Sequence, residues 1–332
     1  MASGRSDKRV GLIAILALCV LGRASAAEPQ EAGRQYQVGL VTLATSPSGG
    51  GLWSGLIEAM RELNYMEGRN LVVRRASAEG KPDRLPGLVA ELVKSQVDVL
   101  VTTATRETVA AKRATSTIPI VMTLVPDPVA LGVVASLARP GGNVTGLTNL
   151  VPGLSQKYVE LLREVTPSAS RFAVVAGLGG PASGIRDDLQ IAARQLGVTL
   201  AFVQVNDPDN FDPSLARAKK NGAQGIVVPV DVVTYSNRRK LVALANKHRL
   251  PGIYWAREYV EDGGLMTYAA SLYEVGRRAA YFVDRILKGA KPAELPVEQP
   301  TKFELIINLK TAKALGLAIP PALLVRADQL IE

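Results

Sequence analysis

The sequence predicts an α/β protein of two lobes, each built on a parallel β-sheet that helices cover. From residue 36 onward, short β-branched apolar runs alternate with longer stretches of helical period. This alternation is typical of βαβ units around a buried parallel sheet. It breaks once, at residues 139–143 (RPGGN), and then resumes. Because roughly 300 residues of globular chain exceed the size of most single cores, two consecutive open sheets are expected.

The first lobe is predicted from strand-like runs that alternate with helical stretches. Strands are expected over residues 38–43, 71–75, 97–102, 118–122 and, after the break, 144–147. Helices are expected over residues 52–63, 85–93 and 107–114. Asn64 and Gly68 should end the first helix, because both residue types tolerate left-handed backbone.

The second lobe is predicted from a second alternation of the same kind. Its helices are expected over residues 158–165, 189–196, 215–220 and 239–248. Its strands are expected over residues 172–175, 199–205, 225–230 and 252–255. This order again indicates a parallel sheet with helices on its faces.

The C-terminal part does not simply extend the second alternation. A strand (265–269), an amphipathic helix (272–287), a strand (303–308) and a helix (309–315) follow one another. This order suits a chain that crosses to the first lobe and returns. Lobe 1 is then residues 36–148 plus 269–295, and lobe 2 is residues 149–268 plus 296–332. Three crossovers, near residues 146–152, 268–271 and 296–302, would form a hinge.

The N-terminus has the three parts of a secretory signal peptide. Arg5, Lys8 and Arg9 precede the apolar run 10–21, and small residues follow at 24–26. An apolar run of about a dozen residues is shorter than the roughly 20 that a membrane-spanning helix needs. Cleavage after Ala26 and a periplasmic location are therefore expected. Cys19, the only cysteine, follows the large Leu18 and not a small residue, which favours a soluble protein over a lipid-anchored one.

Composition and motifs argue against nucleic-acid binding and catalysis. The net charge is +9, but the basic residues are scattered among acids and do not form a stripe with interleaved aromatics. His248 is the only histidine, and no Cys cluster, HExxH or GxSxG motif is present. We therefore expect no enzyme activity, no metal and no cofactor.

Several segments resemble a known family. They are residues 98–102 (DVLVT), 118–121 (IPIV), 127–129 (DPV), 136–146 (SLARPGGNVTG), 263–268 (GGLMTY), 285–292 (RILKGAKP) and 303–317. From about residue 37 to the end, the chain resembles ABC-transporter substrate-binding proteins of the group that includes tryptophan and tyrosine binders. The resemblance implies the type I periplasmic-binding-protein fold with two Rossmann-like lobes, and it implies ligand binding coupled to transport.

Candidate ligand-binding residues follow the strands, because open parallel sheets bind ligands beyond the carboxyl ends of their strands. In the first lobe they are Ala44, Thr45, Ser46, Trp53, Thr103, Ala104, Thr105 and Asp127. Thr103 and Thr105 stand at a helix start, where backbone amides favour a carboxylate, although a hydroxyl there could only cap the helix. Asp127 could meet an ammonium group or merely form a turn. Trp53 could stack on a ligand or pack in the core.

In the second lobe the candidates are Gly177, Asp231, Trp255, Arg257 and Tyr268. Gly177 begins a glycine-rich loop that would allow close backbone approach. Arg257 and its neighbour Glu258 must point into the cleft or pair with each other, and pairing is the favoured interpretation. Tyr268 could contact ligand or fill the hinge.

These observations predict a monomeric, periplasmic solute-binding component of an ABC importer. It would bind a small carboxylate, an amino acid or an aromatic or apolar acid, between its lobes and deliver it to an inner-membrane permease. The alternative is a sensor that presents its closed form to a membrane receptor.

Overall fold

The computed structural model describes residues 34–44, 51–149, 151–177 and 183–332. Two β-sheets organise this part of the chain, and both belong to one compact unit, Gln35–Glu332. Every strand and helix predicted above has a counterpart among the described residues. The α/β fold class with two sheets is therefore confirmed.

The first sheet has five parallel strands in the order β2-β1-β3-β4-β5. The strands are β1 (Tyr36–Thr42), β2 (Leu71–Ser77), β3 (Val99–Thr102), β4 (Ile120–Val125) and β5 (Val144–Thr148). The helices that connect them are α1 (Gly51–Glu62), α2 (Leu85–Lys94) and α3 (Thr105–Ala114), with the 3₁₀ turn η1 (Pro82–Arg84). β3 is buried along its whole length, which explains its unbroken apolar run. Asn64 and Gly68 have φ of 67° and 82°, as predicted for the end of α1.

The second sheet has seven strands in the order β12-β11-β10-β9-β8-β6-β7. They are β6 (Arg171–Ala176), β7 (Thr199–Gln204), β8 (Ile226–Val228), β9 (Gly252–Tyr254), β10 (Met266–Ala269), β11 (Glu304–Asn308) and β12 (Gln329–Ile331). Its helices are α4 (Leu154–Val165), α5 (Ser183–Leu196), α6 (Phe211–Lys220), α7 (Val232–Ser236), α8 (Arg238–Lys247), α9 (Arg257–Glu261), α11 (Leu309–Leu315) and α12 (Pro321–Arg326), with the 3₁₀ turn η2 (Pro208–Asn210).

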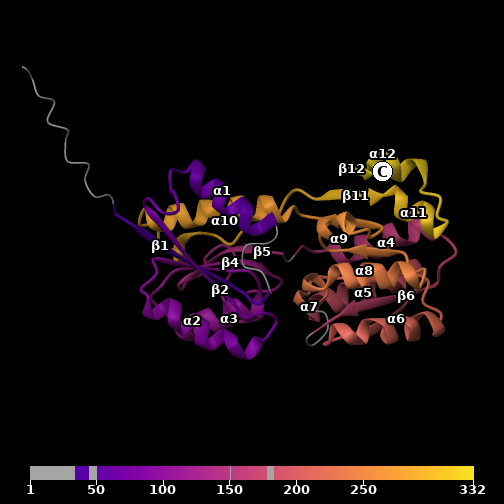
Figure 1. Cartoon of the computed structure of the whole chain (residues 1–332), viewed down its shortest axis with the longest axis horizontal. Helices are drawn as coiled ribbons and strands as arrows, with labels where there is room; N and C mark the ends of the chain where they lie inside the picture. The colour runs from indigo at the N-terminus through magenta and orange to yellow at the C-terminus, as the bar shows by residue number, and fades with distance from the viewer. Residues whose placement is uncertain (1–33, 45–50, 150, 178–182) are drawn as a thin grey trace, which may run out of the picture. The chain divides into compact units, whose positions relative to one another are not determined.

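The helix α10 (Leu272–Leu287) leaves the second sheet and packs on the first, where it lies beside α1 and contacts β3, β4 and β5 (Figure 1). After α10 and the turn η3 (Pro292–Glu294) the chain returns and forms β11. The chain returns to the sheet at the end where β10 leaves it. For this reason β11 runs antiparallel to β10. This pair is the one departure from the predicted parallel sheets among the described strands.

The strand order reverses at an equivalent place in each sheet. In the first sheet the reversal lies between β1 and β3, and in the second it lies between β6 and β8. In open α/β sheets, ligand-binding loops lie beyond the carboxyl ends of the strands at such a point. Ligand-binding loops are therefore expected after β1, β3, β6 and β8.

Candidate functional site

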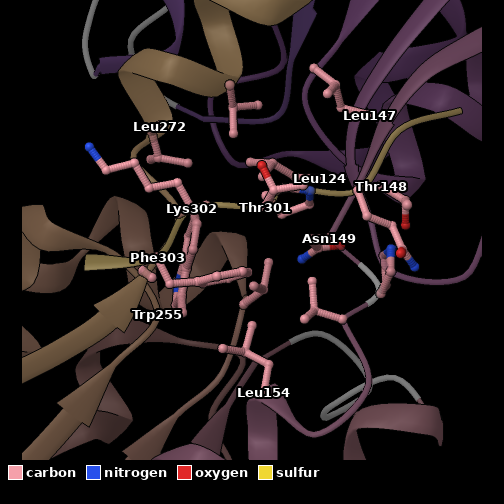
Figure 2. Close-up of a pocket in the computed structure, with 18 of the residues that line it drawn as sticks. Leu124, Leu147, Thr148, Asn149, Leu154, Trp255, Leu272, Thr301, Lys302 and Phe303 are labelled. Carbon is pink, nitrogen blue, oxygen red and sulfur yellow. The ribbon is translucent and has the colours of Figure 1, made fainter. Parts of the chain in front are cut away.

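A cavity of about 970 Å³ is lined by residues that follow strands of both sheets (Figure 2). Leu124 and Pro126 come from the end of β4, whereas Val230 and Trp255 follow β8 and β9. The connections between the sheets complete the wall, with residues 147–149, 269–272 and 298–304. The volume is at the upper end of the range of small-molecule sites, about 300–1,000 Å³.

Most of the cavity wall is apolar. The labelled side chains of Leu124, Leu147, Leu154 and Leu272 surround it, together with the rings of Trp255 and Phe303 (Figure 2). Each of the two rings packs against another aromatic side chain. Trp255 is only 7% exposed and packs against Tyr235 with the ring centroids 5.1 Å apart. Phe303 stacks on Tyr268 at 5.6 Å. A wall of fixed aromatic rings suits a ligand with an apolar or aromatic body.

Polar groups lie among these apolar side chains. Arg278 on α10 forms a two-pronged ion pair with Glu298, with both nitrogen–oxygen distances 2.6 Å. The side chain of Thr148 donates to the carbonyl of Val125 at 2.5 Å. Asn149, Thr301 and Lys302 lie on the connections between the sheets, whereas Ser155 and Asp188 lie on α4 and α5. The site therefore combines apolar bulk with a few groups that could orient a ligand.

Among the predicted residues that the structure describes, only Trp255 lines this cavity. Tyr268 supports the wall indirectly through Phe303. Trp53, on α1, is 5% exposed and belongs to a hydrophobic cluster. It therefore packs in the core, which was one of the two interpretations of this residue. Thr45 and Ser46 lie outside the described residues. The remaining candidates fall into three local arrangements, and their contacts with a ligand stay predictions.

The first arrangement lies at the carboxyl ends of β1 and β3. The carbonyl of Ala44 accepts a hydrogen bond from Ser77 at 2.5 Å. Ala104 is the N-cap residue of α3 and makes no side-chain cap, while Thr105 is the first residue of that helix. Thr103 donates to Oε1 of Glu107 at 2.7 Å. Neither threonine is therefore the N-cap residue. Thr103 instead donates a hydrogen bond to a buried carboxylate.

Glu107 is a residue that sequence reasoning missed. Its side chain is 1% exposed, and Oε1 also accepts the backbone N–H of Leu43 at 2.8 Å. Burial raises the pKa of this carboxyl, against the lowering effect of the hydrogen bond from Thr103. Glu107 thus ties the end of β1 to the loop after β3, at the reversal of strand order. It lies on the buried face of α3 with Thr108 and Ala111. Because two of these three residues are polar, no apolar period marked this face in the sequence.

The second arrangement is the turn after β4. Oδ1 of Asp127 accepts the backbone N–H of Ala130 at 2.9 Å, and its carbonyl accepts the N–H of Leu131. These hydrogen bonds are typical of a turn that an aspartate side chain stabilises. They agree with the second of the two interpretations given for Asp127, that it forms a turn.

The third arrangement joins the loops after β6 and β8. The backbone N–H of Gly177 bonds to Asp231, whose Oδ1 also accepts the N–H of Thr234 at 2.8 Å and so caps α7. A Cβ on Gly177 would lie 2.7 Å from Cβ of Val233 and 3.0 Å from Oδ1 of Asp231. Glycine is therefore needed for the close approach of these two loops. Burial raises the pKa of Asp231.

The expected pairing of Arg257 with Glu258 is wrong. Arg257 donates to Oε1 of Glu261 at 2.9 Å and to Gln329 at 2.9 Å. Adjacent residues on a helix point to different sides, whereas residues four apart share one face. Glu258 consequently faces another part of the molecule.

Among the described residues, no group of three or more His, Cys, Asp or Glu side chains could hold a metal ion. No helix in this part of the chain has both the length and the apolar character to cross a bilayer. His248 lies at the end of α8, with Nε2 2.6 Å from Oδ1 of Asp212.

Two sheets of matching strand order beside one shared cavity define a two-lobed α/β binding protein. A sequence model of the family described as "ABC transporter substrate binding protein" matches residues 37–331. The chain belongs to this family, which confirms the predicted resemblance and makes it a substrate-binding protein rather than an enzyme.

Named relatives agree with this assignment. The chain is 26% identical over 285 residues to a tyrosine-binding protein of Clostridioides difficile (strain R20291), covering 86% of this chain and 82% of the relative. A conserved domain protein from Vibrio cholerae has a TM-score of 0.84 at 30% identity, over 90% of this chain and all of that one. An ABC domain from Streptococcus pneumonia, in complex with L-Trp, has a TM-score of 0.81 at 25% identity and the same coverage.

Proposed function

We propose that this protein is the periplasmic binding component of an ABC importer and binds an amino acid with an apolar or aromatic side chain. The observation that carries the proposal is the cavity wall, in which Trp255 and Phe303 are held rigidly among leucines. The names of two relatives, a tyrosine-binding protein and a complex with L-Trp, favour the same ligand class.

The proposed mechanism is closure of lobe 1 (36–148 plus 269–295) and lobe 2 (149–268 plus 296–332) on the ligand. The three connections between the sheets would act as the hinge, because a few connecting residues can absorb the rotation. The closed monomer would then dock on a permease in the inner membrane. The signal-peptide pattern of residues 1–26 supports the periplasmic location.

A thermal-shift screen tests the ligand class. L-Tyrosine and L-tryptophan are expected to raise the unfolding temperature, whereas glucose and galactose should not. Ligand at 100 times its dissociation constant stabilises a fold by about 2.7 kcal/mol, which is readily measured. Stabilisation by sugars alone would contradict the proposal.

Intrinsic fluorescence tests the position of the ligand. The chain has two tryptophans, of which Trp255 lines the cavity and Trp53 does not. With excitation that tyrosine does not absorb, L-tyrosine should change the emission of wild type and Trp53→Phe but not that of Trp255→Phe. A response that survives in Trp255→Phe and disappears in Trp53→Phe would place the ligand elsewhere.

A further inference from the structure

Glu258 is a partly buried residue with one fully buried carboxylate oxygen. It is the second residue of α9, three positions after Trp255. Oε2 is buried and has no hydrogen-bond partner within the described part of the chain. Of the basic residues around it, Arg257 pairs with Glu261, and Arg238, whose positive charge acts on Glu258, also forms an ion pair with Asp262, its Nε 2.9 Å from Oδ2.

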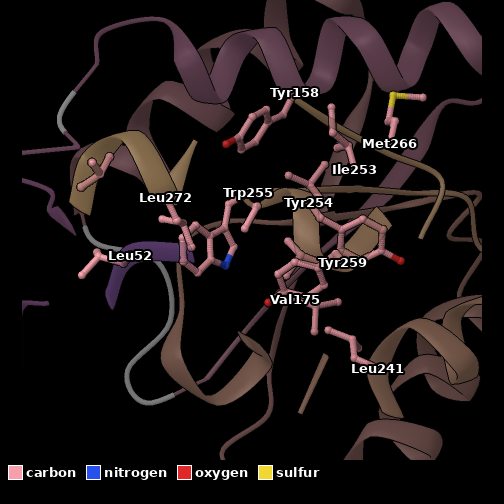
Figure 3. Packing of buried hydrophobic residues seen from close by; sticks show 14 of the residues in the cluster. Leu52, Tyr158, Val175, Leu241, Ile253, Tyr254, Trp255, Tyr259, Met266 and Leu272 are labelled. Carbon is pink, nitrogen blue, oxygen red and sulfur yellow. The ribbon is translucent and has the colours of Figure 1, made fainter. Parts of the chain in front are cut away.

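Segments that follow strands of both sheets converge on this carboxylate. The backbone N–H of Gly51, the first residue of α1, hydrogen-bonds to it. The hydroxyl of Tyr235, on α7 after β8, also hydrogen-bonds to this carboxyl group, and its ring packs against Trp255. Leu272 at the start of α10 lies beside the Trp255 ring (Figure 3). Glu258 therefore lies where the carboxyl ends of the two sheets meet, next to the cavity wall.

This placement is unfavourable for an ionised carboxylate. Burial raises the pKa of Glu258, and the nearby negative charge of Glu261 raises it further, against the lowering effect of Arg238. A buried charge whose hydrogen bonds are incomplete costs free energy. Groups of this kind concentrate at functional sites, where a ligand supplies what is lacking. A primary ammonium group supplies a positive charge and three N–H donors.

We propose that Glu258 binds the ammonium group of the ligand, while the apolar body of the ligand lies in the cavity beside Trp255. The inference rests on the proposed amino-acid ligand and assigns the residue that distinguishes an amino acid from the corresponding acid without an amino group. The sequence left two alternatives for Glu258, pointing into the cleft or pairing with Arg257, and pairing was the favoured one.

The test compares L-tyrosine with 3-(4-hydroxyphenyl)propionate, which has the same ring and carboxylate but no amino group. Calorimetric titration should show that Glu258→Gln weakens L-tyrosine binding by about 10- to 100-fold, the loss expected for a charged hydrogen bond. Affinity for 3-(4-hydroxyphenyl)propionate should be unchanged. Glu261→Gln, which removes the same charge from an exposed position on the same helix, should leave both affinities unchanged.

Two results would overturn the inference. Equal weakening of both compounds in Glu258→Gln would mean that Glu258 acts through its contact with Gly51, and unchanged affinity for both would remove it from the site. If wild type binds neither compound, the proposed ligand class itself fails. A melting temperature of Glu258→Gln at or above that of wild type shows that folding is intact. If the variant is unstable, Glu258→Asp, which keeps the charge, should still prefer L-tyrosine, and loss of that preference would also count against the inference.

Discussion

Trp255→Ala is expected to lower the free energy of unfolding by about 3–5 kcal/mol, the range for removing a buried aromatic side chain. Trp255 is 7% exposed, and its ring packs against Tyr235 and Tyr259 at centroid distances of 5.1 and 6.5 Å. Alanine would remove one aromatic contact from each of these rings and would enlarge the cavity. Urea denaturation of the ligand-free protein measures the loss.

The matched control is Trp53→Ala, which removes the other tryptophan. Because Trp53 is 5% exposed, a comparable loss of stability is expected. Only Trp255→Ala should also weaken L-tyrosine binding, on the order of 30-fold for a buried aromatic anchor of an interface. Equal affinities of the two folded variants for L-tyrosine would contradict the placement of the ligand against Trp255.

Gly276→Ala should destabilise the protein by about 3 kcal/mol, at the upper end of the usual cost of overpacking. Gly276 lies on α10 where that helix meets α1, and a Cβ there would be 1.9 Å from the carbonyl oxygen of Leu52. Gly55 on the facing helix has the same role, since its Cβ would be 2.1 Å from the carbonyl oxygen of Tyr273. Backbone atoms cannot move aside as side chains can, so the two helices must separate.

Gly87→Ala on α2 provides the opposite expectation. Gly87 is exposed, and a Cβ there would meet nothing within 4 Å. Alanine should therefore stabilise the protein by about 0.5–1 kcal/mol through its higher helix propensity. Denaturant midpoints of the two variants should move in opposite directions from wild type. A Gly276→Ala variant as stable as wild type would show that α1 and α10 do not pack closely through these glycines.

The helices and the strand that sequence reasoning missed are short. The helices α7 and α9 have five residues each, α12 has six, and the strand β12 has three. Such segments are too short to show a hydrophobic period, so no pattern marks them. They nevertheless carry Tyr235 and Glu258, and α7 begins next to Asp231. Part of the candidate site thus lies in elements that no periodicity reveals.

Local pattern alone determined the order of the longer strands and helices and the division into two sheets, because each of these signals lies within a short contiguous segment. The family resemblance likewise rests on short contiguous segments. Only the tertiary structure decided which side chains share a site. Leu124, Trp255 and Phe303 lie far apart in the chain but line one cavity, and Gly51 reaches Glu258 from the other sheet. The directions in which Arg257 and Glu258 point depend on where α9 begins, because adjacent residues on a helix point to different sides. A single sequence records the period of neighbouring residues, but contacts between distant segments arise only when the sheets and their connections pack together.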